Sequence, residues 1–183
     1  MIVEGNMDVV SSHQAGVAQV VATAGTALTD WQLKSLARLT ETVVLAFDSD
    51  KAGLAATERA IPIAREAGVE LMIVTLPGEA KDPDELIQED VSLWQQAIET
   101  ASPVIDWVID THIAESGVET AAGKRIVTTR SVEVLRPLTD SVEIEHYLKK
   151  IADKTHTSFE AVKQKFDQPA SETQQPFKRV QSE

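Results

Sequence analysis

The chain has 183 residues, of which 43% are hydrophobic and only 4% aromatic, and its formal net charge is −12. This length and composition are typical of one or two water-soluble domains with an aliphatic core. The absence of cysteine excludes disulfides and zinc–thiolate sites, and the acidic balance disfavours unspecific binding to nucleic-acid phosphates unless metal ions or a basic partner screen the charge.

The first ninety residues alternate short apolar runs with helical patterns, which predicts β-α-β units around a parallel sheet with flanking helices. Strands are expected at 1–3, 18–22, 42–47 and 70–76. Helices are expected at about 7–16, from 29 onward and at about 52–67. The helix that begins at the capping box Thr29–Gln32 is expected to place Leu33, Leu36 and Leu39 on one face.

From Asp82 onward the pattern predicts helices and no further strands. Asp82 can cap a helix whose first position is Pro83. Further helices are expected at 103–116, 120–138, 141–155 and 158–166, before a polar tail at 167–183 that we expect to be disordered. The predicted domains are therefore 1–90 and 91–166. We interpret Trp31, Trp94 and Trp107 as packing residues, and His13, His112, His146 and His156 as surface residues.

Carboxylates follow three of the predicted strands: Glu4 the first, Asp48 and Asp50 the third, and Asp82 and Asp84 the fourth. The carboxyl ends of parallel strands form the edge where such sheets bind ligands, so we expect these side chains to converge. Residues two apart in extended backbone point the same way, so Asp48 and Asp50 can serve one cation or two neighbouring ones. Hard oxygen donors without cysteine select Mg²⁺ or Mn²⁺.

Simpler interpretations exist for each acid taken alone. A single D-x-D pair is a weak signal, and Asp50 and Asp82 can both serve as helix caps. Glu4 alone would be unremarkable. The position of every acid at a strand end favours the metal site, because clustered carboxylates need a counter-charge.

Four motifs in order resemble the Toprim domain of bacterial, DnaG-type DNA primases. They are V-E-G-N-M-D-V at 3–9, A-G-T-A-L-T at 24–29, V-V-L-A-F-D-S-D-K-A-G at 43–53 and L-P-G-E-A-K-D-P-D-E-L at 76–86. The following helices resemble the helical subdomain of the primase RNA-polymerase core, so the resemblance extends to about residue 166. It implies an α/β Toprim fold, a Rossmann-like parallel sheet with flanking helices, followed by an all-α helical subdomain.

The resemblance implies synthesis of short RNA primers on single-stranded DNA by nucleotidyl transfer assisted by Mg²⁺ or Mn²⁺. By position, Glu4 matches the Toprim glutamate, a metal ligand or acid/base, and Asp48 and Asp50 match the metal-binding D-x-D. Further acidic positions of the same site are matched by Asp8, Asp82 and Asp84.

The sequence also departs from the family pattern. Asn6 replaces the usual aromatic residue, and Ser49 replaces the usual glycine of D-G-D. The family's zinc-binding domain, basic subdomain and C-terminal helicase-binding domain have no counterpart in the sequence, so we expect a fragment that makes little primer alone. The implied partners are a single-stranded DNA template and nucleoside triphosphates, held with the basic subdomain, and a replicative helicase, contacted through the C-terminal domain.

Sequence features also bear on location. No apolar run reaches the roughly 18 residues needed to cross a bilayer, and the start of the chain does not resemble a signal peptide. We therefore expect a cytoplasmic protein, and the resemblance to primases implies that it acts at the replication fork.

Other functions stay open at this stage. A Toprim topoisomerase needs a nucleophilic tyrosine, and Tyr147, the single tyrosine, lies on an apolar helix face. A Toprim nuclease would use the same metal site. A D-x-D-x-T phosphotransferase would need threonine where Ala52 stands. A non-catalytic module that binds a partner through its helical half would need no metal site.

Overall fold

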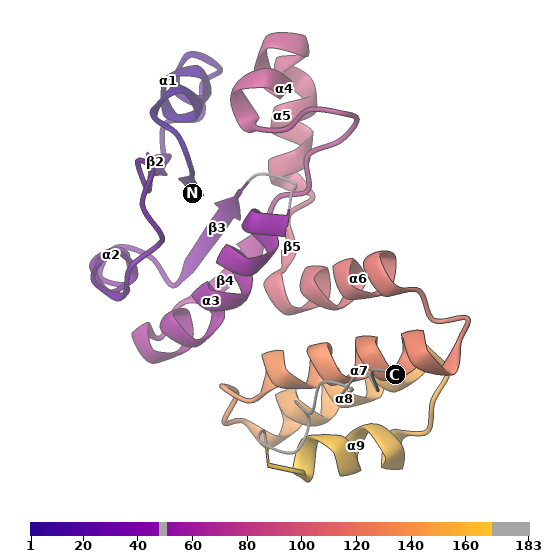
Figure 1. The fold of residues 1–183 in the computed structure, drawn as a ribbon. Coiled ribbons are helices and arrows are strands. Elements are labelled where there is room, and N and C mark those ends of the chain that lie inside the picture. Colours follow the sequence, from indigo (N-terminus) through magenta and orange to yellow (C-terminus); the bar gives the residue numbers. More distant parts are fainter. Residues whose placement is uncertain (48–50, 170–183) are drawn as a thin grey trace, which may run out of the picture. The chain divides into compact units, whose positions relative to one another are not determined.

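The computed structural model describes residues 1–47 and 51–169, and Figure 1 shows its helices and strands. One sheet contains five strands in the order β2-β1-β3-β4-β5. The strands are β1 Ile2–Val3, β2 Val21–Ala22, β3 Thr42–Ala46, β4 Glu70–Ile73 and β5 Ser102–Pro103. The neighbouring pairs among β1, β2, β3 and β4 are all parallel, which confirms the predicted parallel sheet.

The strand β5 corrects the prediction that no strand follows Asp82. It pairs antiparallel with β4, with Ser102 opposite Ile73 and Pro103 opposite Met72. A strand of two residues is too short to leave an alternating pattern, and the proline suggested the start of a helix. The helix does begin at the next residue, while the proline is tolerated because β5 lies at the edge of the sheet.

Five helices belong to this α/β part of the chain: α1 Asn6–Gln14, α2 Asp30–Leu36, α3 Lys51–Ala67, α4 Pro83–Glu89 and α5 Val91–Glu99. The predicted capping box at α2 is present, since the Gln32 amide donates to Thr29 Oγ1 at 3.3 Å and Gln32 Oε1 accepts from the Thr29 amide at 2.8 Å. Gly16 has φ +88°, as expected for a glycine just beyond a helix end.

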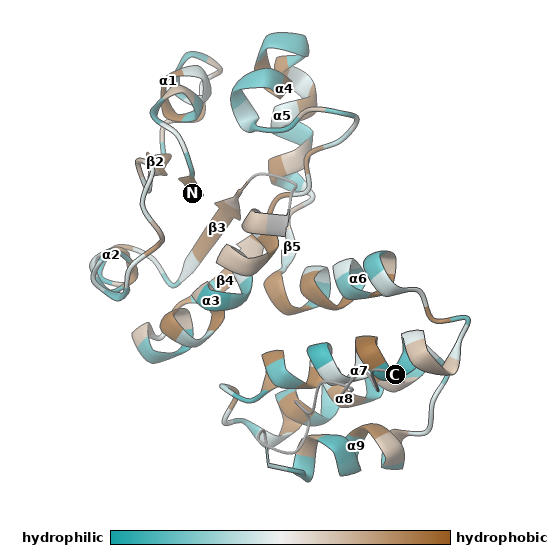
Figure 2. Ribbon diagram, viewed as in Figure 1, coloured by the Kyte–Doolittle hydropathy of each residue, from teal (hydrophilic) through white to brown (hydrophobic). Residues whose placement is uncertain are grey.

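Strand residues alternate between the two faces of the sheet, and both faces are covered. Val3 and Ala46 pack into a buried cluster with Leu86 of α4 and with Trp94 and Ala97 of α5. Their neighbours Ile2 and Leu45 point to the other face and are also buried. Figure 2 shows β3 as hydrophobic over most of its length, as expected for a strand with helices on both sides.

Helix α2 is shorter than the apolar pattern suggested. Leu33 is fully buried as predicted, but α2 ends at Leu36, so Leu39 lies beyond the helix and is 83% exposed. Trp31 is 76% exposed, so its interpretation as a packing residue is wrong, whereas that of Trp94 is confirmed by its complete burial. A three-residue spacing cannot predict a shared face when the helix stops before the third residue.

The chain divides into two compact units, Met1–Thr111 and the part from His112 onward. The first unit extends past residue 90 because Trp94 and Ala97 belong to its core. The helix α6, Val104–Ser116, contains the boundary.

The second unit is helical, with α7 Ala121–Leu135, α8 Ser141–Thr155 and α9 Phe159–Asp167 in mutual contact. The turn before α7 is tight, because a Cβ at Gly123 would lie 2.5 Å from the Gly117 carbonyl oxygen. His112 is fully buried, with Nδ1 3.1 Å from Ser131 Oγ, which corrects its interpretation as a surface residue. Within the described ranges, no helix is both long enough and apolar enough to cross a membrane.

Candidate functional site

Glu4 follows β1 directly and lines a hollow of about 280 Å³ at the carboxyl end of the strand. The parallel register places Val3 beside Ala46, so the ends of β1 and β3 are neighbours. Phe47, the residue after β3, lines the same hollow. The carboxylate predicted at this edge of the sheet is therefore next to the end of the strand that leads to the D-x-D motif.

One wall of the hollow is a face of α3. Ala52, Ala56 and Arg59 line it, and their spacing of four and three residues places them on one side of the helix. The small alanines leave room for a ligand, and the exposed Arg59 adds a cation to the same hollow as the Glu4 carboxylate. Arg59 was not predicted as a site residue, because the sequence does not show which face of α3 borders the hollow.

Another wall is the A-G-T-A-L-T segment, which is tied to the backbone of Glu4. The Glu4 carbonyl accepts from the Ala24 amide at 3.1 Å and from Thr23 Oγ1 at 3.4 Å. Thr26 Oγ1 then donates to the Thr23 carbonyl at 2.7 Å. Ala24 and Gly25 both have positive φ, so the chain turns sharply here. These bonds hold the turn of this motif against the end of β1.

Asp48 and Asp50 lie outside the described residues, so the predicted convergence with Glu4 stays a prediction. Among residues 1–47 and 51–169, no three carboxylate or imidazole groups gather closely enough to hold a metal ion. Glu4 is thus the one predicted catalytic residue whose position the structure describes.

The remaining predicted acids form a separate group between α1 and α4. Asp8 is 5% exposed, and its two oxygens accept from the Gly5 amide at 2.9 Å and the Asp84 amide at 3.1 Å. The Asp84 carboxylate accepts from the Ser11 hydroxyl and, at 2.9 Å, from the Gln88 side chain. The Asp84–Asp8 and Ser11–Asp84 bonds join residues more than seventy positions apart and fasten the start of α4 to α1.

Asp82 caps α4 as predicted, accepting from the Glu85 amide at 2.8 Å. Burial raises the pKa of Asp8 despite its two backbone hydrogen bonds, and the negative charges of Asp82 and Asp84 raise it further. The structure therefore brings Asp8, Asp82 and Asp84 close enough to interact electrostatically. A nearby cation would relieve this repulsion.

The donor chemistry fits a divalent metal. Glu4 offers a partly exposed carboxylate inside an open hollow, and the two aspartates that follow β3 in the sequence would add oxygen donors alone. Such a set suits Mg²⁺ or Mn²⁺ better than softer metals.

Comparisons with known proteins agree with this architecture. Residues 1–87 match a family model described as Toprim-like, and residues 105–160 match one described as the DnaB-helicase binding domain of primase. A DNA primase of Clostridium acetobutylicum is 38% identical over 163 residues, which are 88% of this chain and 27% of that protein. The chain thus spans about a quarter of the length of the curated relatives it matches.

Solved structures give the same result. A DNA primase domain from Pseudomonas aeruginosa is 26% identical with a TM-score of 0.71, over 92% of this chain and 54% of that one. The Aquifex aeolicus primase, with zinc-binding and RNA polymerase domains, is 30% identical with a TM-score of 0.64, over 88% of this chain and 38% of that one.

The sheet, the glutamate after β1 and the profile match define the first part of the chain as Toprim-like. The chain as a whole belongs to the bacterial DnaG-type DNA primase family, of which it represents a segment.

Proposed function

We propose that the chain supplies the metal-dependent catalytic face of a primase, which synthesises short RNA primers on single-stranded DNA. The observation that carries this proposal is the position of Glu4 in a hollow at the adjacent carboxyl ends of β1 and β3. The family membership supports it, because the relatives that cover most of this chain are DNA primases.

Glu4, Asp48 and Asp50 are the proposed metal ligands and catalytic carboxylates. Bound Mg²⁺ or Mn²⁺ would neutralise the triphosphate and favour deprotonation of the attacking 3′-hydroxyl. Arg59 faces the same hollow and would donate hydrogen bonds to phosphate oxygens. The alanines beside it leave space for the nucleotide.

Asp8, Asp82 and Asp84 have a supporting role in this proposal. Their oxygens accept hydrogen bonds within the protein, so we assign Asp8 and Asp84 first to holding α4 against α1, and Asp82 to capping α4. Their shared negative charge would still favour divalent ions near this edge of the sheet.

Thermal unfolding with and without Mg²⁺ or Mn²⁺ tests the metal site. The ion should raise the melting temperature of the chain, because ligands that bind only the folded state stabilise it. Replacing both Asp48 and Asp50 by Asn should abolish that rise. Glu41→Gln is the matched control. Glu41 is an exposed acid just before Thr42, the first residue of β3, whereas the D-x-D motif follows the last residues of the strand in the sequence. An equal rise in the Asp48→Asn, Asp50→Asn variant would refute the proposed ligands.

A priming assay tests whether the chain needs a basic primase segment to make primers. Because the net charge of the chain is −12, it should hold template DNA poorly and make little primer when supplied with template, nucleoside triphosphates and Mg²⁺. Activity should appear when a basic primase segment is added. Efficient template-dependent synthesis by the 183-residue chain alone would contradict this expectation.

The match of residues 105–160 favours a second role, contact with a replicative helicase of the DnaB type. The family resemblance implied a helicase contact in a domain outside the chain, whereas this match supports a contact within α6, α7 and α8. Val142, 75% exposed at the start of α8, is a candidate contact. Val142→Asp should weaken helicase binding measured by calorimetry, while Leu39→Asp in the first unit should not.

A further inference from the structure

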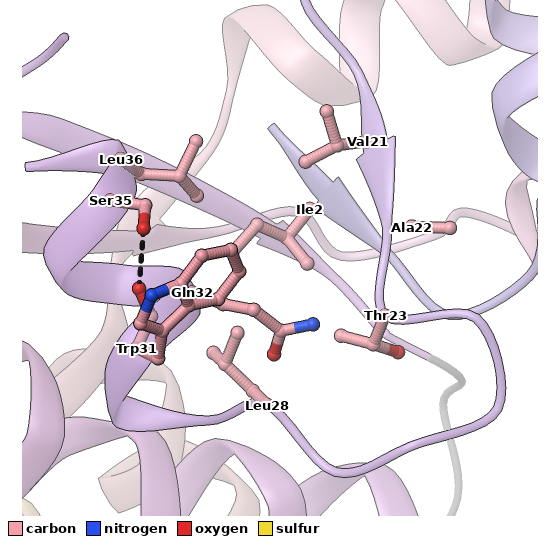
Figure 3. Close-up of a pocket in the computed structure, with 9 residues that line it drawn as sticks. All are labelled: Ile2, Val21, Ala22, Thr23, Leu28, Trp31, Gln32, Ser35 and Leu36. Carbon is pink, nitrogen blue, oxygen red and sulfur yellow. Dashed lines mark hydrogen bonds between the residues drawn. The ribbon is translucent and has the colours of Figure 1, made fainter.

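A second hollow of about 200 Å³ lies between β2 and α2, next to the one that Glu4 lines. The two hollows share Thr23 and Leu28 as a common wall. Figure 3 shows Trp31 and Gln32 entering it from α2, with Val21 and Thr23 on the strand side. The proposed catalytic role uses neither α2 nor this hollow.

The hollow is apolar and uncharged in an otherwise acidic unit. None of its nine lining residues carries a charge. Trp31, with 76% of its surface exposed, presents a large aromatic side chain at its rim. Leu28 and Leu36 add apolar surface. An anion gains nothing from such a lining, whereas a flat, neutral ring can stack on the indole and contact the aliphatic groups.

Gln32 adds a directed hydrogen-bond donor. Its Oε1 is held by the capping box, accepting from the Thr29 amide at 2.8 Å and from Thr29 Oγ1 at 3.0 Å. The amide group therefore has its N–H donors to offer to a ligand. Every nucleobase has carbonyl or ring-nitrogen acceptors at its edge, so a stacked base can accept this bond.

We propose that this hollow binds an unpaired nucleobase of a single-stranded nucleic acid whose neighbouring nucleotides reach the Glu4 hollow. Trp31 stacks on the base and Gln32 donates to its edge. The shared wall at Thr23, whose hydroxyl donates to the Glu4 carbonyl, links the two places. This inference rests on the proposed function, because it assigns the second hollow to the strand that the first one would process.

Binding of an oligothymidine with an uncharged methylphosphonate backbone tests the proposal. The uncharged backbone removes repulsion by the acidic chain, so that the bases alone are measured. Fluorescence anisotropy of the labelled strand gives Kd. Trp31→Ala should raise Kd about tenfold or more, and Trp31→Phe should raise it less, because a ring is retained. Leu39→Ala, which removes another exposed apolar side chain, should leave Kd unchanged.

The control ligand has the same backbone with abasic sugars, and it should bind weakly and equally to wild type and Trp31→Ala. Three results would overturn the proposal: no thymine-dependent binding by wild type, an unchanged Kd in Trp31→Ala, or self-association through Trp31 without base dependence. Glu41→Gln, at an exposed acid that lines neither hollow, should also leave this Kd unchanged. A failure of the catalytic proposal would appear in metal binding and priming, and a failure of this one only in base binding.

Discussion

The two compact units of this chain differ in their balance of acidic and basic residues. Residues 1–111 contain 18 Asp and Glu against 6 Lys and Arg, whereas residues 112–183 contain 11 of each. In the first unit, Asp8 is buried near two other aspartates. In the second, Lys165 is half-buried, and its Nζ donates to Thr128 Oγ1 at 2.7 Å, Thr129 Oγ1 at 2.9 Å and the Arg125 carbonyl at 3.2 Å.

This contrast shows that the whole net charge belongs to one unit. Added divalent cations are expected to stabilise the acidic unit, because they relieve repulsion among its carboxylates. The helical unit has equal numbers of acidic and basic residues, so no comparable effect of cations is expected there. Substitutions in either unit test this difference in charge and packing.

The largest expected effect is that of Trp94→Ala in the first unit. Trp94 is fully buried in the core cluster, so its removal should cost about 3–5 kcal/mol of unfolding free energy in that unit. Hydrogen exchange should show lost protection in β3 and β4 but little change in α7 and α8. Trp31→Ala, at an exposed tryptophan, is the control and should change stability little. Equal loss of protection in both units would mean that they unfold together.

Asp8→Asn should have an intermediate effect of about 1–3 kcal/mol, because an amide nitrogen cannot accept from the Gly5 or Asp84 amide. The cost should depend on pH. Burial raises the pKa of Asp8 in the folded state, so the folded state binds this proton more tightly than the unfolded state does. The contribution of Asp8 to the free energy of unfolding therefore falls as pH rises above 3.8. Denaturant unfolding should therefore show a larger cost at pH 4 than at pH 7.

A pH-independent cost of Asp8→Asn would contradict the assigned cause of the pKa shift. Ser11→Ala is a useful companion, because it removes a bond to Asp84 without touching the charge of Asp8.

The smallest effect is expected for Lys165→Met in the second unit, less than about 1 kcal/mol near neutral pH. Both threonine hydroxyls still donate to backbone carbonyls, so no polar group is left unsatisfied. Burial, and then the charge of Arg125, lowers the pKa of Lys165. The unfolded state therefore binds more protons just below pH 10.5, and the stability of wild type relative to Lys165→Met should rise with pH in that range. The opposite trend would contradict the lowered pKa of Lys165.

The sequence predicted an element well where that element depends on interactions between adjacent residues. The capping box at Thr29 and the Asp82–Pro83 helix start depend on a few adjacent residues, and both are present. Prediction failed where distant residues decide the outcome. His112 is buried because Ser131, nineteen residues away, offers a partner, and β5 exists because β4 offers an edge.

The candidate site divides in the same way. The location of Glu4 at the end of β1 followed from the strand pattern alone. The hydrogen bonds that fasten Asp84 to Asp8 could not be predicted, because they depend on how α4 packs against α1. Arg59 was missed because its role depends on which face of α3 borders the hollow.

The order of the strands has a consequence for behaviour at high concentration. Both borders of the sheet are strands of only two residues, β2 and β5, while the longer apolar strands β3 and β4 lie inside. Pro103 in β5 lacks an N–H group, which further limits pairing with another chain. The sheet thus offers little template for fibril-like stacking of molecules, and the surplus negative charge of the same unit adds colloidal repulsion.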